Sequence, residues 1–137
     1  MSYFKQCFWK SDEAYCTRFK SKISDMFEPY VRPQENSSHY GCRELNVYGN
    51  NCVLKFSAKK SNGKPKNLSF NASEYSQEEL WNKKHNFELE KSDCNIICVD
   101  YQMAGVGSNS CGPALAQKYR IQLPDVSGQI LMEIKHK

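Results

Sequence analysis

Residues 43–58 read RELNVY, GNN and CVLKFSA in succession, and this pattern is the strongest indication of a β fold in the sequence. Arg43–Tyr48 and Cys52–Ala58 are short segments of alternating or β-branched character, which is typical of strands. Gly49–Asn50–Asn51 lies between them and suits a tight turn, because glycine and asparagine tolerate a positive φ. The stretch therefore predicts an antiparallel hairpin.

The same rhythm recurs along the chain and predicts an all-β, mainly antiparallel domain. Ser61–Pro65 reads as a second turn that leads into a strand at Asn67–Phe70. Cys94–Tyr101 is apolar on both alternating faces, which predicts a strand in the middle of a sandwich. Lys118–Leu123 alternates apolar with polar residues and predicts a strand buried on one face. Gln129–Lys135 is expected to form the final strand.

One short helix interrupts this β pattern. Ser76-Gln-Glu-Glu79 has the form of a capping box, in which the serine and the second glutamate satisfy each other's free backbone donors. Leu80 and Trp81 follow at once. We expect the helix to end near Lys84–His85.

Length and charge exclude several classes of protein. The chain has 137 residues, which is the size of one compact domain, and its formal charge of +4 is spread along the sequence. Nucleic-acid binders concentrate their basic residues in a stripe, so nucleic acid is not an expected partner. No stretch reaches the ~20 apolar residues that cross a bilayer, and Met1–Lys20 does not resemble a signal peptide. We expect a cytoplasmic protein without a membrane partner.

Seven cysteines occur without a C-x-x-C pair, and their odd number does not favour a closed disulfide framework or a zinc site. If Cys94 and Cys98 lie in one strand, their α-carbons are about 13 Å apart at ~3.3 Å per residue, too far for a bridge. Reduced thiols are the simpler expectation.

No self-sufficient catalytic constellation stands out. Gly105–Ser110 contains only a fragment of a dinucleotide-binding fingerprint, and a flexible loop after a buried strand explains it better. The three histidines are scattered, no two carboxylates are marked as a glycosidase pair, and Cys111 has no evident base. We therefore expect no catalytic residue, no metal and no cofactor in this chain.

Five segments, in order, resemble the carboxyl-terminal domain of lac-type β-galactosidases, of glycoside hydrolase family two. P-Y-V-R-P-Q-E-N followed by R-E-L is the most specific part of the match. Residues 1–22 match poorly and residues 23–137 match well, so we expect a partial β-galactosidase-type domain over 23–137. The segments are Ser24–Asn36, Cys42–Leu45, Phe70–Ser76, His85–Asn86 and Gly105–Gly107.

The resemblance implies a β-sandwich of the galactose-mutarotase-like supersandwich type. It also implies that the catalytic glutamates lie outside this chain, on a barrel domain. The loop that contains Asn109, Ser110 and Cys111 would contribute to the galactoside site. Many members have a tryptophan where this chain has Cys111, and a thiol offers no π face for a sugar. Tyr101, Tyr119 or an aromatic side chain on the partner are the candidates to replace it.

Arg32 and Glu35 allow two interpretations. The resemblance places them near the sugar, as substrate-binding residues. The structural alternative puts one of them in a buried ion pair, with Asn36 capping a turn after Pro33.

The leading hypothesis is a noncatalytic β-galactosidase domain that packs on a catalytic barrel or large subunit and helps to form the site for a galactoside such as lactose. Such a partial domain is expected to expose strand edges or an apolar patch, and homo-oligomerisation is one way to cover them. A free-standing carbohydrate-binding or subunit-interaction module is the alternative. A mutarotase-like enzyme that uses His39 and Glu35 is a third reading.

Overall fold

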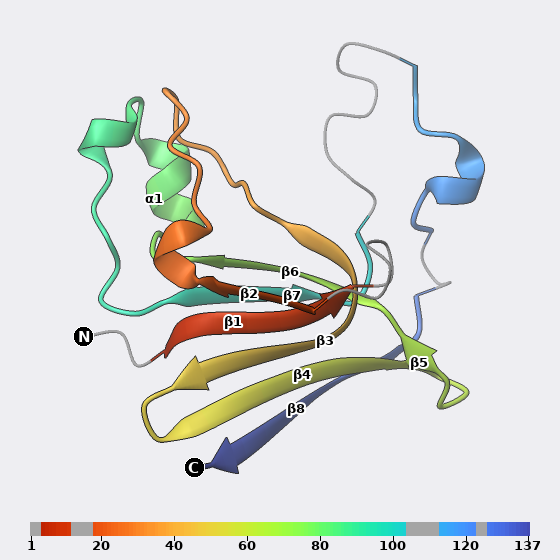
Figure 1. The fold of residues 1–137 in the computed structure, drawn as a ribbon. Coiled ribbons are helices and arrows are strands. Elements are labelled where there is room, and N and C mark those ends of the chain that lie inside the picture. Colours follow the sequence, from red (N-terminus) through yellow and green to blue (C-terminus); the bar gives the residue numbers. More distant parts are fainter. Residues whose placement is uncertain (1–3, 12–17, 104–112, 123–125) are drawn as a thin grey trace.

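A computed structural model describes residues 4–11, 18–103, 113–122 and 126–137. The described strands form one antiparallel sheet, and a short α-helix and three 3-10 helices lie outside it (Figure 1). The fold is mostly antiparallel β-sheet with one short helix, as predicted for an all-β sandwich. The strands are β1 (Phe4–Ser11), β2 (Arg18–Lys22), β3 (His39–Gly49), β4 (Cys52–Lys60), β5 (Pro65–Lys66), β6 (Leu68–Ser73), β7 (Ile96–Asp100) and β8 (Gly128–His136). The helices are η1 (Ile23–Asp25), α1 (Gln77–Asn82), η2 (Asn86–Glu88) and η3 (Gln117–Tyr119).

The predicted hairpin is confirmed as β3 and β4. Leu45 pairs with Phe56 and Val47 pairs with Leu54. Directly opposed residues point to the same face of a sheet, so these four apolar side chains share the core face. Leu45 and Val47 are fully buried there.

The sheet forks at β3. One edge of β3 pairs with β1, and the other edge pairs with β6 near its beginning and with β4 near its end. The register between β3 and β6 shifts between His39 and Cys42, and Gly41 lies in this irregularity with a φ of +68°. Glycine adopts that backbone conformation without a Cβ penalty, so it suits a bulge that lets the two branches separate.

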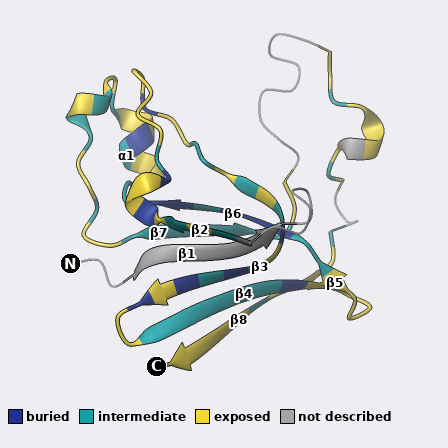
Figure 2. Cartoon of the chain, in the orientation of Figure 1, coloured by how far each residue is buried: buried dark blue, intermediate teal, exposed yellow. Residues whose placement is uncertain are grey.

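Both branches contribute to one hydrophobic core. Its fully buried large side chains include Phe70 and Leu68 from β6 and Leu45 from β3. Ile23, in η1, is also buried and belongs to the same cluster. In Figure 2 the buried residues concentrate along β3 and β6 and in the small helices above them. The cluster consists of Ile23, Met26, Cys42, Leu45, Val47, Ala58, Leu68, Phe70 and Ala72, with Phe19, Leu54, Phe56, Ile97, Val99 and Tyr101 packed against it.

β7 differs from its predicted position in the middle of a sandwich. Among the described strands it pairs with β6 alone, and all five of its residues are only half-buried. Apolar residues on both faces of a strand indicate that both faces are partly buried. They do not indicate whether the strand pairs with one neighbour or with two. β7 is therefore a partly covered edge strand.

The predicted strand at Lys118–Leu123 is wrong. Gln117–Tyr119 forms η3, and residues 120–122, which are described, are not in a strand. The Arg120 amide donates to the Gln117 carbonyl over 3.1 Å, and the Arg120 Nε donates to the Leu115 carbonyl over 2.7 Å. These local bonds close a turn, and the alternating pattern of side chains does not reveal them. Leu123 lies outside the described residues.

The helix is present but shorter than predicted, because it ends at Asn82 and Lys83 is already extended. The Ser76 hydroxyl accepts from the Glu79 amide over 3.1 Å, which confirms the cap. The reciprocal half of the predicted box is wrong, because the Glu79 carboxylate accepts from the Glu90 amide instead.

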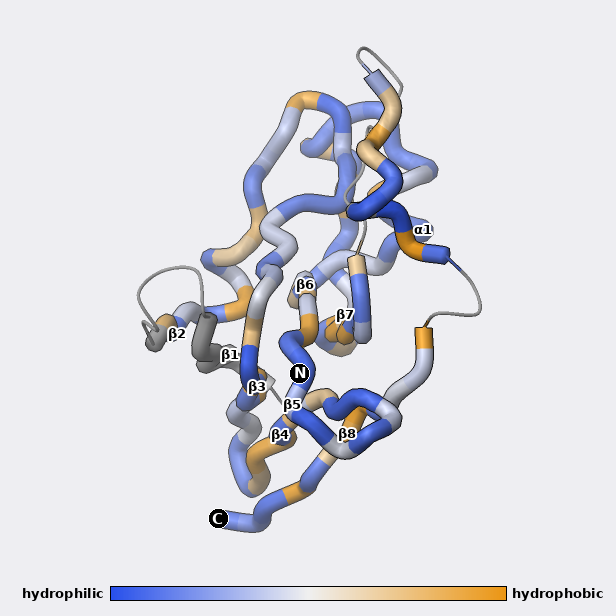
Figure 3. The backbone as a smooth tube through the Cα atoms, turned by 90° about the vertical axis from the view of Figure 1, so that its right-hand side faces the viewer, coloured by the Kyte–Doolittle hydropathy of each residue, from blue (hydrophilic) through white to orange (hydrophobic). Residues whose placement is uncertain are grey.

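β8 confirms the predicted final strand and forms an exposed edge of the sheet. Ile130, Met132 and Ile134 face the same side as Ala58, Phe56 and Leu54 of β4, yet they are 42%, 58% and 57% exposed. Figure 3 shows that β8 carries both hydrophobic and hydrophilic residues. The apolar face of the sheet thus continues beyond the core. We call Ile130, Met132 and Ile134 the β8 strip.

Two further expectations concern the described residues. Cys42, Cys52, Cys94 and Cys98 are all free thiols, as predicted. None of the described helices is long and apolar enough to cross a membrane.

Candidate functional site

A hollow of about 620 Å³ opens beside the end of β7. Met103 and Leu115 both line it, and they lie on either side of the segment 104–112, so the hollow is at the foot of the predicted substrate loop. We call it the Tyr101 hollow. Its lining residues are Tyr40, Gly41, Lys66, Asn67, Ser69, Tyr101, Gln102, Met103, Leu115, Lys118 and Arg120.

Tyr101 organises this hollow. Its hydroxyl donates to the Ser127 carbonyl over 2.8 Å, which ties the end of β7 to the residue just before β8. The Lys66 Nζ lies 5.7 Å from the centroid of the Tyr101 ring, a cation–π distance. The hydroxyl of the phenol is therefore bonded and one face of its ring lies near a cation, and the ring forms an aromatic wall of the hollow.

The described groups around the hollow can bind a polar ligand that also has an apolar face. Tyr40 and Tyr101 offer aromatic surface, and Asn67 and Ser69 offer amide and hydroxyl groups. Hydrolysis of a glycoside needs two carboxyl groups on either side of the scissile bond. The described lining residues include neither a carboxylate nor an imidazole, and segment 104–112 has none in its sequence.

Of the five predicted substrate-binding residues, Arg32 and Glu35 lie in a described segment and the other three do not. Asn109, Ser110 and Cys111 lie outside the described residues. Tyr101, named as a possible replacement for the missing stacking tryptophan, lines the hollow beside their segment.

Sequence reasoning missed the other walls. Tyr40 comes from β3, Lys66 from β5, and Asn67 lies between β5 and β6. Only the pairing of β3 with β6 brings these positions together, and the one signal in the sequence was an aromatic residue beside the bulge glycine, Tyr40–Gly41.

Arg32 and Glu35 lie elsewhere. Both are exposed, so the predicted buried ion pair is wrong. They line a second hollow, of about 420 Å³, together with Pro33, Gln34, Gln77, Leu80 and Trp81. We call it the Trp81 hollow.

Asn36 fastens the segment that carries Arg32 and Glu35. Its side chain accepts from the Glu28 amide and donates to the Glu28 carbonyl, both over 3.0 Å. It also donates to the Gln34 carbonyl over 3.1 Å. The predicted turn-capping role of Asn36 after Pro33 is therefore confirmed.

His39 and Glu35, the pair of the mutarotase-like reading, line different hollows. The His39 ring stacks on Phe70, with the ring centroids 4.9 Å apart. Burial lowers the pKa of His39, and a hydrogen bond with the Ser37 backbone opposes this shift. The histidine packs against the core, which does not favour the mutarotase-like reading.

The fold and the Tyr101 hollow define a class: an antiparallel β domain with an aromatic and polar binding hollow whose described lining holds no acid pair. A family model described as β-galactosidase small chain matches residues 10–132. The chain belongs to the β-galactosidase small-chain family, as the resemblance implied.

Individual relatives agree with this family. The chain is 49% identical over 107 residues to a β-galactosidase of Actinobacillus pleuropneumoniae, an alignment that covers 78% of this chain and 9% of the relative. It is 32% identical over 116 residues to a β-galactosidase of Staphylococcus xylosus, covering 78% of this chain and 10% of the relative. A β-galactosidase of Streptococcus thermophilus is 37% identical over 97 residues, or 70% of this chain and 9% of the relative. The chain thus spans about a tenth of the length of these relatives.

Proposed function

We propose that this chain is a noncatalytic wall of a β-galactoside site, and that the acids that cleave the glycoside lie on other parts of the enzyme. The observation that carries the proposal is the Tyr101 hollow. It combines an aromatic ring with amide, hydroxyl and cationic donors at the foot of segment 104–112. Sugars are bound by such sets, because their C–H faces pack on rings and their hydroxyls take hydrogen bonds.

The β8 strip supports a partner. An apolar face that continues onto an exposed edge strand is typical of an interaction surface. Because the matched relatives are about ten times longer than the aligned part, we propose that the rest of a β-galactosidase, including its catalytic barrel, covers this strip. A homo-oligomer that buries the same strip is the competing outcome.

Complementation tests this function. The catalytic remainder of the Actinobacillus pleuropneumoniae relative, without the segment that matches this chain, is mixed with this chain and a chromogenic β-galactoside. We expect turnover from the mixture and none from either part alone. Turnover by the isolated chain, or a mixture that binds but stays inactive, would contradict the proposal.

Two tyrosines of β3 allow the contribution of the Tyr101 hollow to be tested against that of another part of the surface. Tyr40 lines the hollow and is 59% exposed, whereas Tyr48, 38% exposed, lies near the other end of the strand beside the Lys137 Nζ. In the complemented enzyme, Tyr40→Ala is expected to raise KM several-fold, and Tyr48→Ala is the matched control. Equal effects of the two variants would remove the hollow from the substrate site.

A further inference from the structure

Trp81 is the most exposed large hydrophobic side chain among the described residues, at 86%. It lies in the second turn of α1, next to the buried Leu80, and forms one wall of the Trp81 hollow. Exposing an indole to water costs free energy, so its position at the wall of a hollow suggests a surface for a ligand.

The wall that carries Trp81 is rigid. Leu80 and Pro33 are buried on either side of the hollow. The Gln77 amide donates to the Glu35 carboxylate over 3.3 Å and to the Cys98 Sγ over 3.6 Å, so it ties α1 both to the Arg32–Glu35 segment and to β7.

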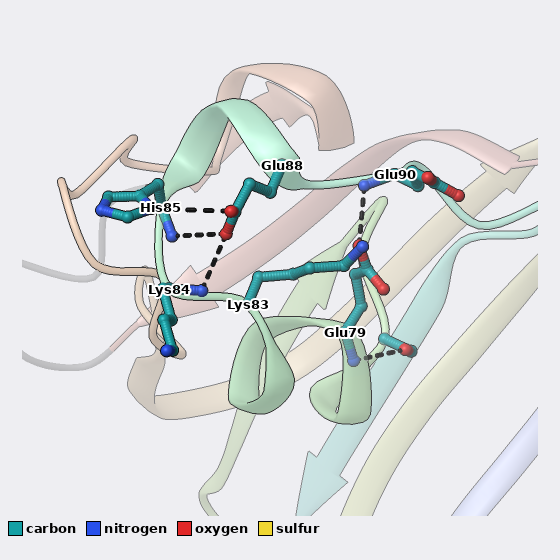
Figure 4. A network of polar contacts seen from close by, with 7 residues as sticks. Glu79, Lys83, Lys84, His85, Glu88 and Glu90 are labelled. Atoms are coloured by element: carbon teal, nitrogen blue, oxygen red, sulfur yellow. Dashed lines mark hydrogen bonds and ion pairs between the residues drawn. The ribbon is translucent and has the colours of Figure 1, made fainter.

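Two carboxylates, Glu79 in α1 and Glu88 in η2, accept hydrogen bonds from the chain that follows α1 (Figure 4). Glu79 accepts from the Glu90 amide over 2.8 Å and pairs with the Lys83 Nζ over 3.5 Å. Glu88 accepts from the Lys84 and His85 amides over 3.0 and 2.9 Å. These bonds tie the carboxyl end of α1 to the segment that follows it.

The polar groups of this hollow suit an uncharged, hydroxyl-rich ligand. Arg32 supplies donors, Glu35 supplies acceptors and the Gln77 Oε1 supplies a further acceptor, and the formal charges of the lining residues cancel. The Tyr101 hollow differs, because its described lining holds three cations and no carboxylate. A sugar ring has both of the surfaces that the Trp81 hollow complements: an apolar face for the indole and equatorial hydroxyls for planar side chains.

We propose that the Trp81 hollow is a second sugar-binding site, which takes one neutral hexose unit stacked on Trp81 with its hydroxyls bonded to Arg32, Glu35 and Gln77. It is separate from the Tyr101 hollow. Asn67 and Ser69 of that hollow lie at the start of β6, whereas α1 follows the far end of β6, and Figure 1 shows α1 and β5 on opposite sides of the molecule. The site therefore holds a saccharide without cleaving it, and it does not depend on the proposed function.

Lactose and galactose are the probes, titrated into the full chain and followed by tryptophan emission and by saturation-transfer NMR. The chain has two tryptophans, so the emission change is assigned with Trp81→Phe. We expect saturable binding that Trp81→Ala weakens at least tenfold and that Glu35→Gln weakens several-fold. Phe87→Ala is the matched control, because Phe87 is 81% exposed and stacks on His85 outside the hollow.

Three results would overturn the proposal. The first is the absence of saturable binding to either sugar. The second is an equal loss of affinity in Trp81→Ala and Phe87→Ala, which indicates nonspecific contact. The third is Trp81 emission that stays unchanged with sugar but shifts to the blue with the catalytic remainder of a relative, which assigns the hollow to protein contact.

Discussion

Gly128 shows how one residue joins the site to the fold. A Cβ placed on Gly128 would overlap the hydroxyl and the Cζ of Tyr101, and it would come within 2.5 Å of the Lys59 carbonyl. The absence of a side chain at 128 therefore lets the phenol close against the start of β8. The same phenol forms the wall of the Tyr101 hollow.

Gly128→Ala is expected to destabilise the chain by about 1–3 kcal/mol, the usual cost of forcing a methyl group into a packed contact. Urea unfolding measures the change. In the Tyr101→Ala background the same substitution is expected to cost less, because one of the two clashes is gone. Equal costs in both backgrounds would show that the Lys59 carbonyl, and not the phenol, causes the strain.

His39 makes stability depend on pH. Its pKa is lowered by burial, so the unfolded chain binds a proton more readily than the folded one. The stabilising contribution is complete above the ordinary histidine pKa of about 6.5 and is lost as the pH falls below that value. We expect a lower urea midpoint at pH 5.5 than at pH 7.5, and a smaller difference in His39→Gln. His85→Gln, at an exposed histidine, serves as the control. If the urea midpoint becomes less dependent on pH in His85→Gln and not in His39→Gln, the pH dependence does not arise from His39.

At the scale of elements, the segment after α1 is held by side chains that reach the backbone. The capping box predicted at Ser76 and Glu79 forms one element later, between His85 and Glu88. The hydrogen bond from the His85 amide is the largest cause that lowers the pKa of Glu88. The Lys84 amide and the His85 side chain lower it further. The ionised carboxylate is thus the form that the turn prefers.

Glu88→Ala is expected to speed amide hydrogen exchange at Lys84 and His85 several-fold, because both N–H groups lose their acceptor. NMR-detected exchange measures it residue by residue. Glu78→Ala, on the exposed face of α1, is the control and should leave those two amides unchanged. Protection that survives in Glu88→Ala would mean that packing, and not the carboxylate, holds the turn.

Local signals predicted local structure well. The turn Gly49–Asn51 and the Ser76 cap each depend on a few neighbouring residues, and both are present. The strand predicted at Lys118–Leu123 is absent from its described residues. An alternating pattern indicates which side chains can be buried, but a strand also needs a neighbouring strand to hydrogen-bond with. The two hollows also depend on tertiary contacts. Tyr40 and Tyr101 line one hollow because the sheet forks, and Glu35 and Trp81 line the other, where Gln77 bonds α1 to the Glu35 carboxylate.

At the scale of the whole molecule, the fork in the sheet separates two surfaces. The Tyr101 hollow lies beside the start of β6 and the end of β7, the Trp81 hollow lies between α1 and residues 32–35, and the branch with β4 and β8 carries the exposed β8 strip. The expected apolar patch is therefore present. It lies on the same face of the sheet as the core residues of β4. Binding of sugar and packing against a partner can be tested independently on this chain.

The β8 strip gives the last prediction. Each of Ile130, Met132 and Ile134 is about half exposed, so covering it should contribute about 1 kcal/mol, and the three together enough to decide assembly. Replacing all three with threonine keeps a residue that strands accept and removes apolar area. We expect lower binding of an apolar dye, an unchanged far-ultraviolet circular dichroism spectrum and weaker complementation of the catalytic remainder. Glu133→Gln, on the opposite face of β8, is the control. A triple variant that complements as well as the unaltered chain would show that the partner docks elsewhere. If the triple variant also sediments as a smaller species than the unaltered chain when each is studied alone, the strip belongs to a homo-oligomer.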